Sequence, residues 1–330
     1  MRIEQFDLRA DHAALRAFFQ LYRAGTDHDD PDVPAMSRAS FSNWWAYGFT
    51  GNPQQTWLAR DADGAAGCYL LELPSRDNRG TAFFLPAVPP ARRRRGIGAA
   101  LLAHASGQAR QDGRTLLAGH ALAGSPGDAF AREAGGRAGL TDVRRLLRVG
   151  ADLPGRLARL RAQAESAAAG YTVVSWRGPV PAEHLEPVAA VVSAISDAPR
   201  DEVIEPGRWD AGRVKLIGEW TAEHGLRQFS VAARQASSGE LAALSQAVLD
   251  PGTPGWAFQQ ITVVARQHRG RRLGLLVKTA LHQVLLAADP GIRQVMTVNG
   301  EGNEHMIAIN ELMGYRVAGR IHGWELGLAG

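Results

Sequence analysis

Two stretches of the sequence place arginines directly against glycines at the start of an apolar helical pattern. They are VPPARRRRGIGAALLAH at residues 88–104 and VARQHRGRRLGLLVKTA at residues 264–280, which lie 176 residues apart. A helix start exposes unpaired backbone N–H groups and the positive end of the helix dipole, and small residues there let an anion approach the backbone. Arginine side chains add charge-assisted hydrogen bonds. Each stretch alone also fits a solvated helix start, but the repetition favours binding of a diphosphate.

The distribution of charge argues for a local anion site and against a nucleic-acid surface. The net charge of the chain is +4. Residues 1–150 carry 19 arginines against 15 acidic residues, whereas residues 151–330 carry 18 basic residues against 18 acidic ones. The surplus therefore equals the four arginines at positions 92–95, and no extended basic face follows a phosphate backbone. We expect no nucleic-acid partner.

The composition is that of a globular protein, with 45% hydrophobic residues. The single cysteine, Cys68, cannot form an intramolecular disulfide, which favours a reducing compartment. The most apolar helical stretch is interrupted by Lys278 and His282, so no membrane-spanning segment is expected. The histidines show no metal-ligand spacing. We expect a cytoplasmic monomer or homodimer with no metal ion and no membrane partner.

The elements that must position the two stretches occur in the same order in both halves of the chain. Before each stretch the sequence predicts a hairpin, with turns at residues 63–64 and 236–240, and then an apolar strand. After each stretch it predicts helix, strand, helix and strand. Residues 151–169 read as a polar helical connector rich in Ala and Arg. The sequence therefore predicts an α+β fold with αβα layers and two similar domains, residues 1–150 and 170–330.

The first stretch resembles motif A of the GCN5-related N-acetyltransferases. The family pattern follows a strand and consists of Arg or Gln, two residues, Gly, one residue, and Gly or Ala. Arg93, Gly96 and Gly98 match this pattern, and Arg269 and Gly274 match it in the second stretch. The resemblance covers nearly the whole chain, because the order of strands and helices also agrees in both halves.

The segment NGEGNEHMIAINELMGYRV, residues 299–317, resembles motif B of the same family. Asn303, Met306, Gly314 and Tyr315 stand where the family has Asn, a small or apolar residue, and Gly-Phe/Tyr. The first half keeps only FAREAGGR at this place and has no asparagine there. The tandem arrangement is similar to that of two-domain acetyltransferases of the mycothiol synthase type.

The resemblance implies, in each domain, a mixed and mostly antiparallel sheet flanked by helices. It also implies that the fourth and fifth strands splay apart and that the pantetheine arm of acetyl-CoA lies in the gap. Arg272 stands at the position of the first motif A glycine, but the backbone N–H that would bind phosphate is retained. The residues expected to contact acetyl-CoA or CoA are Val88, Arg93, Arg94, Arg95, Gly96, Ile97 and Gly98, and Val264, Ala265, Arg269, Gly270, Arg271, Arg272, Leu273 and Gly274.

Acetyl transfer to an amine needs a group that accepts the ammonium proton and donors that stabilise the oxyanion. Many family members carry Glu four residues before the motif A valine, where this sequence has Phe84 and Gln260. Neither side chain is a base. Gln260 could orient a water or the amine, or it could be a polar residue satisfied inside the sheet.

The family often uses a Tyr seven residues after the motif B asparagine as the general acid. Here that residue is Asn310, which can donate a hydrogen bond but cannot easily deliver a proton. Asn303 is either a site residue or a helix N-cap. The candidate catalytic residues are Gln260, Asn303 and Asn310.

Four carboxylates stand where the substrate loop of the family runs, and they could face a cationic amine or be solvated. They are Asp197, Asp201, Glu202 and Glu205. Because the second half alone keeps both motifs, the sequence predicts an acetyl-CoA-dependent N-acetyltransferase of a small-molecule amine, with its active site in residues 170–330. The missing Glu and Tyr leave a CoA-binding regulatory or scaffold protein without turnover as the alternative.

Overall fold

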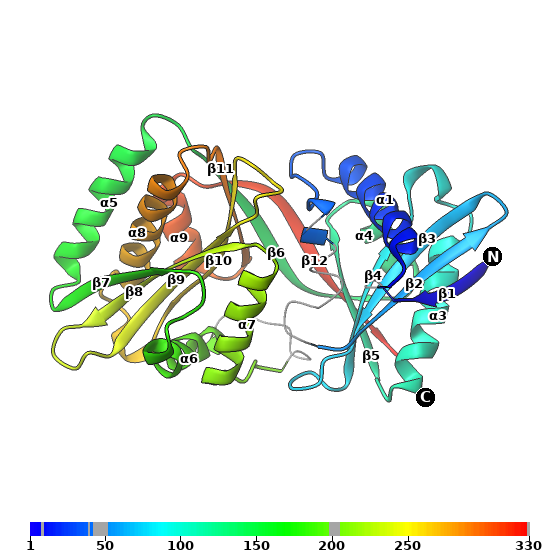
Figure 1. The fold of residues 1–330 in the computed structure, drawn as a ribbon, viewed down its shortest axis with the longest axis horizontal. Coiled ribbons are helices and arrows are strands. Elements are labelled where there is room, and N and C mark those ends of the chain that lie inside the picture. The colour runs from blue at the N-terminus through cyan, green and yellow to red at the C-terminus, as the bar shows by residue number, and fades with distance from the viewer. Residues whose placement is uncertain (8–9, 39, 42–51, 198–204, 329–330) are drawn as a thin grey trace. The chain divides into compact units, whose positions relative to one another are not determined.

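The computed structural model describes residues 1–330 except 8–9, 39, 42–51, 198–204 and 329–330. The contacts divide the chain into two compact units. Unit 1 contains Met1–Asp142, Asp201–Glu205 and Gly319–Gly330, and unit 2 contains Val143–Arg200 and Pro206–Ala318. The C-terminal segment of the chain is therefore part of the N-terminal unit (Figure 1).

Unit 1 is built around a sheet whose strands follow the order β1-β2-β3-β4-β5-β12. Strands β4 and β5 are parallel, and the other described pairs in this order are antiparallel. The elements are β1 (Arg2–Phe6), α1 (His12–Asp29), β2 (Gln54–Asp61), β3 (Gly64–Glu72), β4 (Thr81–Ala87), the 3₁₀ turn η1 (Pro90–Arg92), α3 (Ile97–Gln111), β5 (Leu116–Leu122), α4 (Pro126–Glu133) and β12 (Arg316–Gly327). The strand β6 (Arg137–Arg148) begins in unit 1 and ends in unit 2, whereas β12 begins in unit 2, to which Ala318 belongs, and continues in unit 1 from Gly319.

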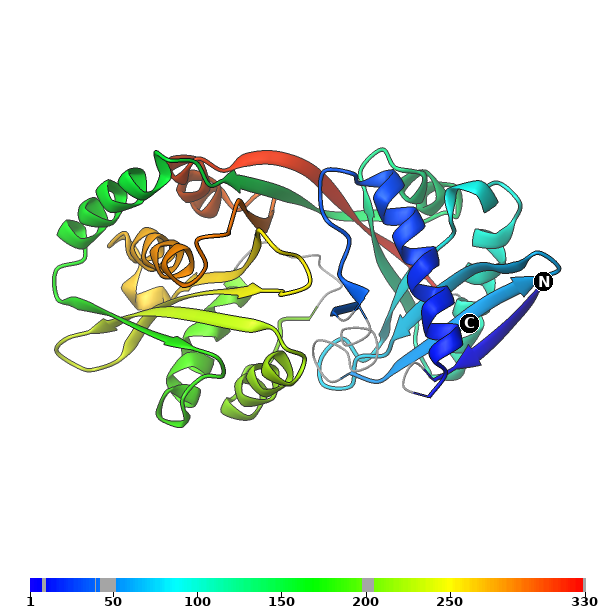
Figure 2. The same cartoon turned by 45° about the horizontal axis from the view of Figure 1, so that its top comes forward.

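Unit 2 repeats this plan with the strand order β6-β11-β10-β9-β8-β7. Here β10 and β11 form the parallel pair. The elements are α5 (Leu153–Ala167), β7 (Tyr171–Arg177), η2 (Ala182–His184), α6 (Leu185–Ser193), η3 (Ala194–Asp197), α7 (Ala211–Glu223), β8 (Arg227–Gln235), β9 (Leu241–Leu249), β10 (Trp256–Val264), η4 (Arg266–His268), α8 (Leu273–Ala288), β11 (Gln294–Gly300) and α9 (Glu304–Met313). Figures 1 and 2 show α5, α8 and α9 on one face of this sheet and α6 and α7 on the other.

Each sheet separates two hydrophobic cores, as the alternation of side chains along a strand requires. In unit 1, Phe18 of α1 packs with Leu58 and Leu70 on one face, while Leu101 of α3 packs with Tyr69 on the other. In unit 2 the helix α8 is buried along nearly its whole length, from Leu273 to His282 and again at Leu285. The predicted α+β class, with mixed sheets flanked by helices, is confirmed.

The stretch 151–169 was expected to be a polar helical connector, and the structure places the helix α5 there with one face buried. Leu153, Leu157 and Leu160 of α5 are buried in the core that also contains residues of α8. The polar residues of the stretch occupy the opposite face of the helix, which is why its composition resembles a linker. The division into domains 1–150 and 170–330 stays a prediction. The contacts group the chain differently at its end, because they assign Gly319–Gly330 to unit 1.

No helix in the described part of the chain is long and apolar enough to cross a membrane.

Candidate acyl-CoA sites

The parallel pair of strands in each unit separates after a few residues. In unit 1, β4 and β5 pair only from Thr81 to Phe83, and β4 continues to Ala87 against β3 alone. In unit 2, β10 and β11 pair only from Trp256 to Phe258, and β10 continues to Val264 against β9 alone. Each splay leaves backbone donors and acceptors without a neighbouring strand, and these groups need a partner when water is excluded.

The loops after β4 and β10 have the same backbone conformation although their glycines differ. Arg94 and Gly96 have positive φ of 60° and 78°, and Gly270 and Arg272, at the matching positions, have 80° and 53°. Each loop thus places two left-handed residues, one of them glycine, just before its helix. A Cβ added at Gly96 or Gly270 would meet nothing within 4 Å, so the space above both loops is open.

The first arginine of each motif forms an ion pair with a carboxylate and donates a hydrogen bond to a carbonyl at or just after the end of the preceding strand. Arg93 makes a two-pronged ion pair with Asp29 at 2.8 Å for both nitrogens, and its Nε donates to the carbonyl of Val88 at 3.0 Å. Arg269 repeats this arrangement, donating to Asp197 at 2.6 Å and to the carbonyl of Val264 at 3.4 Å. These arginines fasten the loop to the strand before it.

The arginines that follow Arg93 and Arg269 in the two loops are exposed. Arg94 is 82% exposed and pairs with Glu133 at 3.1 Å, while Arg95 is exposed. In unit 2, Arg271 and Arg272 are both exposed, and Arg271 donates to the carbonyl of Gln267 at 3.1 Å. The charge available to an anion therefore comes from these residues and from the first backbone N–H groups of α3 and α8.

The second glycine of each motif serves packing between helices. A Cβ at Gly98 would lie 3.2 Å from the ring of Phe130 on α4, and one at Gly274 would lie 3.1 Å from Ile309 on α9. A larger side chain at either position would push the two helices of its unit apart. Ile97 and Leu273 begin the helices and are buried.

Gln260 lies at a break in the pairing of β10 with β9, between Gln259 and Ile261. The extra residue is exposed, whereas Gln259 is buried and its Nε2 donates to the carbonyls of Gln246 at 2.9 Å and Ile261 at 2.8 Å. Such bulges redirect a side chain and often lie beside active sites. In unit 1 the pairing of β4 with β3 continues without a shift from Phe83 to Ala87, and Phe84 is buried.

The asparagines of motif B have structural partners. Asn303 is the N-cap of α9, and its side chain accepts from the backbone N–H of Met306 at 3.3 Å. Asn310 is fully buried, accepts from Nζ of Lys278 at 2.5 Å and donates to Oδ1 of Asn299 at 2.8 Å. Their roles at a catalytic centre stay predictions.

Lys278 is a residue whose importance the sequence analysis missed. Its ammonium is 0% exposed and lies 4.9 Å from the centre of the Tyr315 ring. Burial, together with the charge of Arg145, lowers the pKa of Lys278 to about 7. The only signal was a lysine within an apolar helical pattern in a chain that has only two lysines.

His282, one turn along α8, completes the buried group. Its Nδ1–H donates to the carbonyl of Lys278 at 2.8 Å, so its Nε2 accepts from the hydroxyl of Tyr315 at 2.7 Å. Burial and the neighbouring ammonium lower the pKa of His282 to about 3, so the ring is neutral at pH 7.

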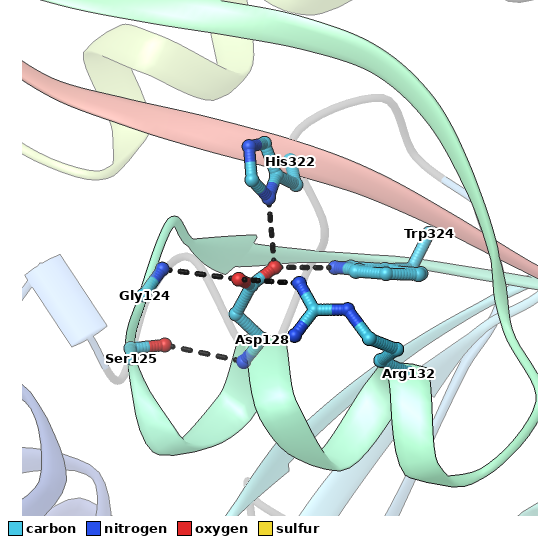
Figure 3. Close-up of polar contacts among 6 residues, drawn as sticks. All are labelled: Gly124, Ser125, Asp128, Arg132, His322 and Trp324. Carbon is cyan, nitrogen blue, oxygen red and sulfur yellow. Dashed lines mark hydrogen bonds and ion pairs between the residues drawn. The ribbon is translucent and has the colours of Figure 1, made fainter.

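A second buried polar group lies in unit 1, where Asp128 of α4 faces β12 (Figure 3). Its carboxylate accepts from Nδ1 of His322 at 2.8 Å, Nε1 of Trp324 at 3.1 Å and the backbone N–H of Gly124 at 3.0 Å. Burial acts to raise the pKa of Asp128, but these donors outweigh it, so the pKa is lowered. Ser125 caps the helix by accepting from the N–H of Asp128 at 3.2 Å.

The acidic stretch is only partly described. Asp201 and Glu202 lie outside the described residues. Asp197 pairs with Arg266 and Arg269, and Glu205 accepts from the backbone N–H of Asn78 at 3.0 Å. Asp197 is thus paired with two guanidinium groups, whereas Glu205 is exposed and accepts one backbone N–H, so a role of either at a substrate loop stays a prediction.

A cavity of about 390 Å³ in unit 2 lies between α6 and the loop that follows β10. Its wall includes Asp197 and Glu240. Glu240 accepts from Gln267 at 2.8 Å, and Asp197 is held by the two arginines described above. The cavity therefore adjoins the loop, and of these two carboxylates in its wall Asp197 is paired with arginines whereas Glu240 accepts from a neutral amide.

Comparison with known structures places this architecture among the acetyltransferases. No protein-family model matches the sequence, and no curated protein matches it. A tandem GNAT protein from the clavulanic acid biosynthesis pathway, solved without AcCoA, is 25% identical over 100% of this chain and 99% of its own, with a TM-score of 0.82. A GCN5-related N-acetyltransferase from Sphaerobacter thermophilus is 16% identical over 100% of this chain and 96% of its own, with a TM-score of 0.71.

Both neighbours align with the whole chain, and both are named as GCN5-related N-acetyltransferases, one in full and one by the abbreviation GNAT. The chain therefore has the tandem fold of the GCN5-related N-acetyltransferases, and the names of its neighbours support an acyltransferase.

Proposed function

We propose that the protein is a cytoplasmic, acetyl-CoA-dependent N-acetyltransferase of a small-molecule amine, monomeric or homodimeric, with its active site in the C-terminal half. The observation that carries this proposal is the splay of β10 and β11, which ends at an open loop before α8. An extended arm bearing amides can satisfy the backbone groups of the splay, and a diphosphate can meet the helix start.

The residues of unit 2 fit acetyl-CoA. The backbone from Gly270 to Gly274, with exposed Arg271 and Arg272, would hold the diphosphate, and the splayed ends of β10 and β11 would hold the pantetheine arm. The backbone N–H of Ala265 donates to the carbonyl of Ala242 at 2.9 Å, so Ala265 would contribute through its carbonyl and side chain. Acetyl-CoA supplies the activated acyl group.

Unit 2 is favoured over unit 1 for the chemistry because it alone has a bulge on the motif A strand. The bulge turns Gln260 outward, where it can orient the amine or a water. Gln260 cannot accept a proton, so the amine should react once it has lost its own proton to solvent. We therefore expect the rate to rise toward alkaline pH, without an acidic limb at about pH 6–7 that a histidine base would produce.

One observation favours the alternative of a CoA-binding protein without turnover. Both functional groups of Asn310, at the position of the family's Tyr, are occupied by Lys278 and Asn299. No proton donor replaces the Tyr at this position.

The test is a steady-state measurement of CoA release from acetyl-CoA with a panel of small amines, using the full chain. Turnover above the hydrolysis rate, with mass detection of the acetylated amine, is the expected result. Gln260→Ala should lower kcat while leaving CoA affinity unchanged, and Gln246→Ala, a half-buried glutamine on β9, is the matched control. Binding of CoA without turnover of any amine would instead support the regulatory alternative.

A further inference from the structure

Three polar side chains form a continuous hydrogen-bonded row across the elements that follow the splayed strands of unit 2. Lys278 lies on α8, which follows β10, and Asn310 lies on α9, which follows β11. Asn299 lies on β11 itself, three residues beyond Met296, where the pairing with β10 ends. Nζ of Lys278 donates to Oδ1 of Asn310 at 2.5 Å, and Nδ2 of Asn310 donates to Oδ1 of Asn299 at 2.8 Å.

The ammonium fixes the orientation of both amides. Protonated Lys278 has donors only, so in this form Asn310 turns its oxygen toward Lys278 and its Nδ2 toward Asn299. Asn299 must then turn its oxygen toward Asn310, which leaves its own NH₂ group as a donor. The described residues supply no partner for this group, and Asn299 is half-buried on the separated part of β11.

Asn299 lies on the face of β11 that the two helices cover. Side chains alternate along a strand, so Asn299 shares a face with Val295, which belongs to the core around α8. The row therefore lies on the side of the gap between β10 and β11 that α8 and α9 cover, and Asn299, on β11, is the member of the row closest to the gap.

The buried lysine has a cost that packing alone does not explain. An ammonium removed from water is strongly destabilised unless it is paired. Unit 1 has Leu102 at the matching position of α3, which shows that an apolar residue suits this place in the fold. The ring of Tyr315 and the single oxygen of Asn310 are the described partners of the ammonium.

We propose that Lys278 is a positioning residue which, through Asn310, orients the Asn299 amide as a hydrogen-bond donor to a carbonyl of the arm of an acyl-CoA between β10 and β11. The inference rests on the proposed function and adds to it the side chains that recognise the arm. Asn299 is the residue that touches the ligand. Lys278 acts on the ligand only through the two amides.

The test compares two ligands by titration calorimetry on the full chain. CoA contains the arm, whereas 3′-phospho-ADP contains the phosphates without it. Asn299→Ala and Lys278→Met should each weaken CoA binding roughly fivefold, the effect of one hydrogen bond, and change 3′-phospho-ADP binding less than twofold. The double variant should bind CoA no more weakly than Asn299→Ala, because both changes remove the same contact. Any CoA site in unit 1 stays the same in all variants.

Tyr315→Phe is the matched control, since it keeps the ring beside Lys278 but removes a buried hydroxyl outside the row. It should bind CoA like the unchanged protein. Equal losses for both ligands in Lys278→Met, or additive losses in the double variant, would show that Lys278 only supports the fold.

If Lys278→Met does not fold, the variant Asn299→Asp provides a second test. A carboxylate keeps the shape of the amide but has no donor, so the same CoA-specific loss is expected. CoA binding that is unaffected by Asn299→Ala and Asn299→Asp would overturn the inference while leaving the proposed function intact. Failure of the unchanged chain to bind either ligand would overturn the proposed function as well.

Discussion

The ammonium of Lys278 should make the stability of the protein depend on pH in a recognisable way. Its pKa is lowered from 10.5 to about 7 by burial and by Arg145. Between these values the unfolded chain binds a proton that the folded chain does not, so the free energy of unfolding rises with pH. The other groups facing Lys278 do not titrate there, because the pKa of His282 is about 3 and burial raises that of Tyr315.

We predict that Lys278→Met is more stable than the unchanged protein at pH 7, and that this advantage shrinks toward pH 10. The change should reach at most about 1.4 kcal/mol per pH unit, the effect of one proton. Urea unfolding of both proteins across this range measures it, with Lys215→Met as the exposed control. A difference that stays constant with pH would contradict a lowered pKa.

Arg93 and Arg94 of the first loop should differ in how much they contribute to the stability of the fold. Arg93 is held by Asp29 and Val88, with 18% of its side chain exposed, whereas Arg94 is 82% exposed. Removing one partner of a largely buried pair leaves the other unsatisfied. Arg93→Gln should therefore cost about 1–3 kcal/mol of stability, whereas Arg94→Gln should cost less than about 0.5 kcal/mol. Thermal unfolding measures both, and equal melting temperatures would refute the role given to Arg93.

Which residues bear charge at the loops could be predicted from the sequence, but what those charges contact could not. Arg93 was expected to address phosphate because it matches the motif, and its partner Asp29 lies 64 positions earlier in the chain. Lys278 and Asn310 likewise meet only because α8 and α9 pack together. Contacts between distant segments depend on packing, which local periodicity does not contain.

At the scale of elements, the local patterns predicted well. The hairpin expected near residues 63–64 is present as β2 and β3. Its turn lies at Ala62–Asp63, and Gly64, which has a positive φ of 103°, is the first residue of β3 and pairs with Asp61. The second hairpin joins β8 and β9. The placement of β12 beside β5 was not predictable, because Ile321–Gly327 pairs with Leu116–Leu122 across some 200 residues of intervening chain.

The hydrogen bonds from His322 and Trp324 of β12 to the carboxylate of Asp128 should help to hold β12 beside β5. Asp128→Ala would leave the donors of His322, Trp324 and Gly124 without their acceptor, at a cost of about 3 kcal/mol. We predict faster amide hydrogen exchange in Ile321–Gly327 in this variant. Asp27→Ala, which removes an exposed ion pair with Arg23 in the same unit, should leave the exchange unchanged. Unchanged exchange in Asp128→Ala would show that the strand is held by its ladder alone.

At the scale of the molecule, the two units share one plan but differ in what surrounds their gaps. Both have a splay, an open loop and a fastened arginine. Only unit 2 has the bulge at Gln260 and the polar row that begins at Lys278, where unit 1 has Leu102. The loops of both units therefore offer an anion exposed arginines and open space, and among the described residues the bulge and the polar row, which the proposed function uses, belong to unit 2.

The matched arginines Arg95 and Arg271 can separate the two units in one experiment. Both are exposed and lie at matching positions in their loops. Each would face the diphosphate of a CoA bound to its own unit. Reversing either charge should introduce a repulsion of about 1–2 kcal/mol and weaken the site roughly five- to thirtyfold. We predict that Arg271→Glu loses turnover at limiting acetyl-CoA. Arg95→Glu should keep turnover and lose, at most, one equivalent of bound CoA in calorimetry. If Arg95→Glu loses turnover and Arg271→Glu keeps it, the active site belongs to the N-terminal unit. The roles proposed for Gln260 and for the row that begins at Lys278 would then be wrong.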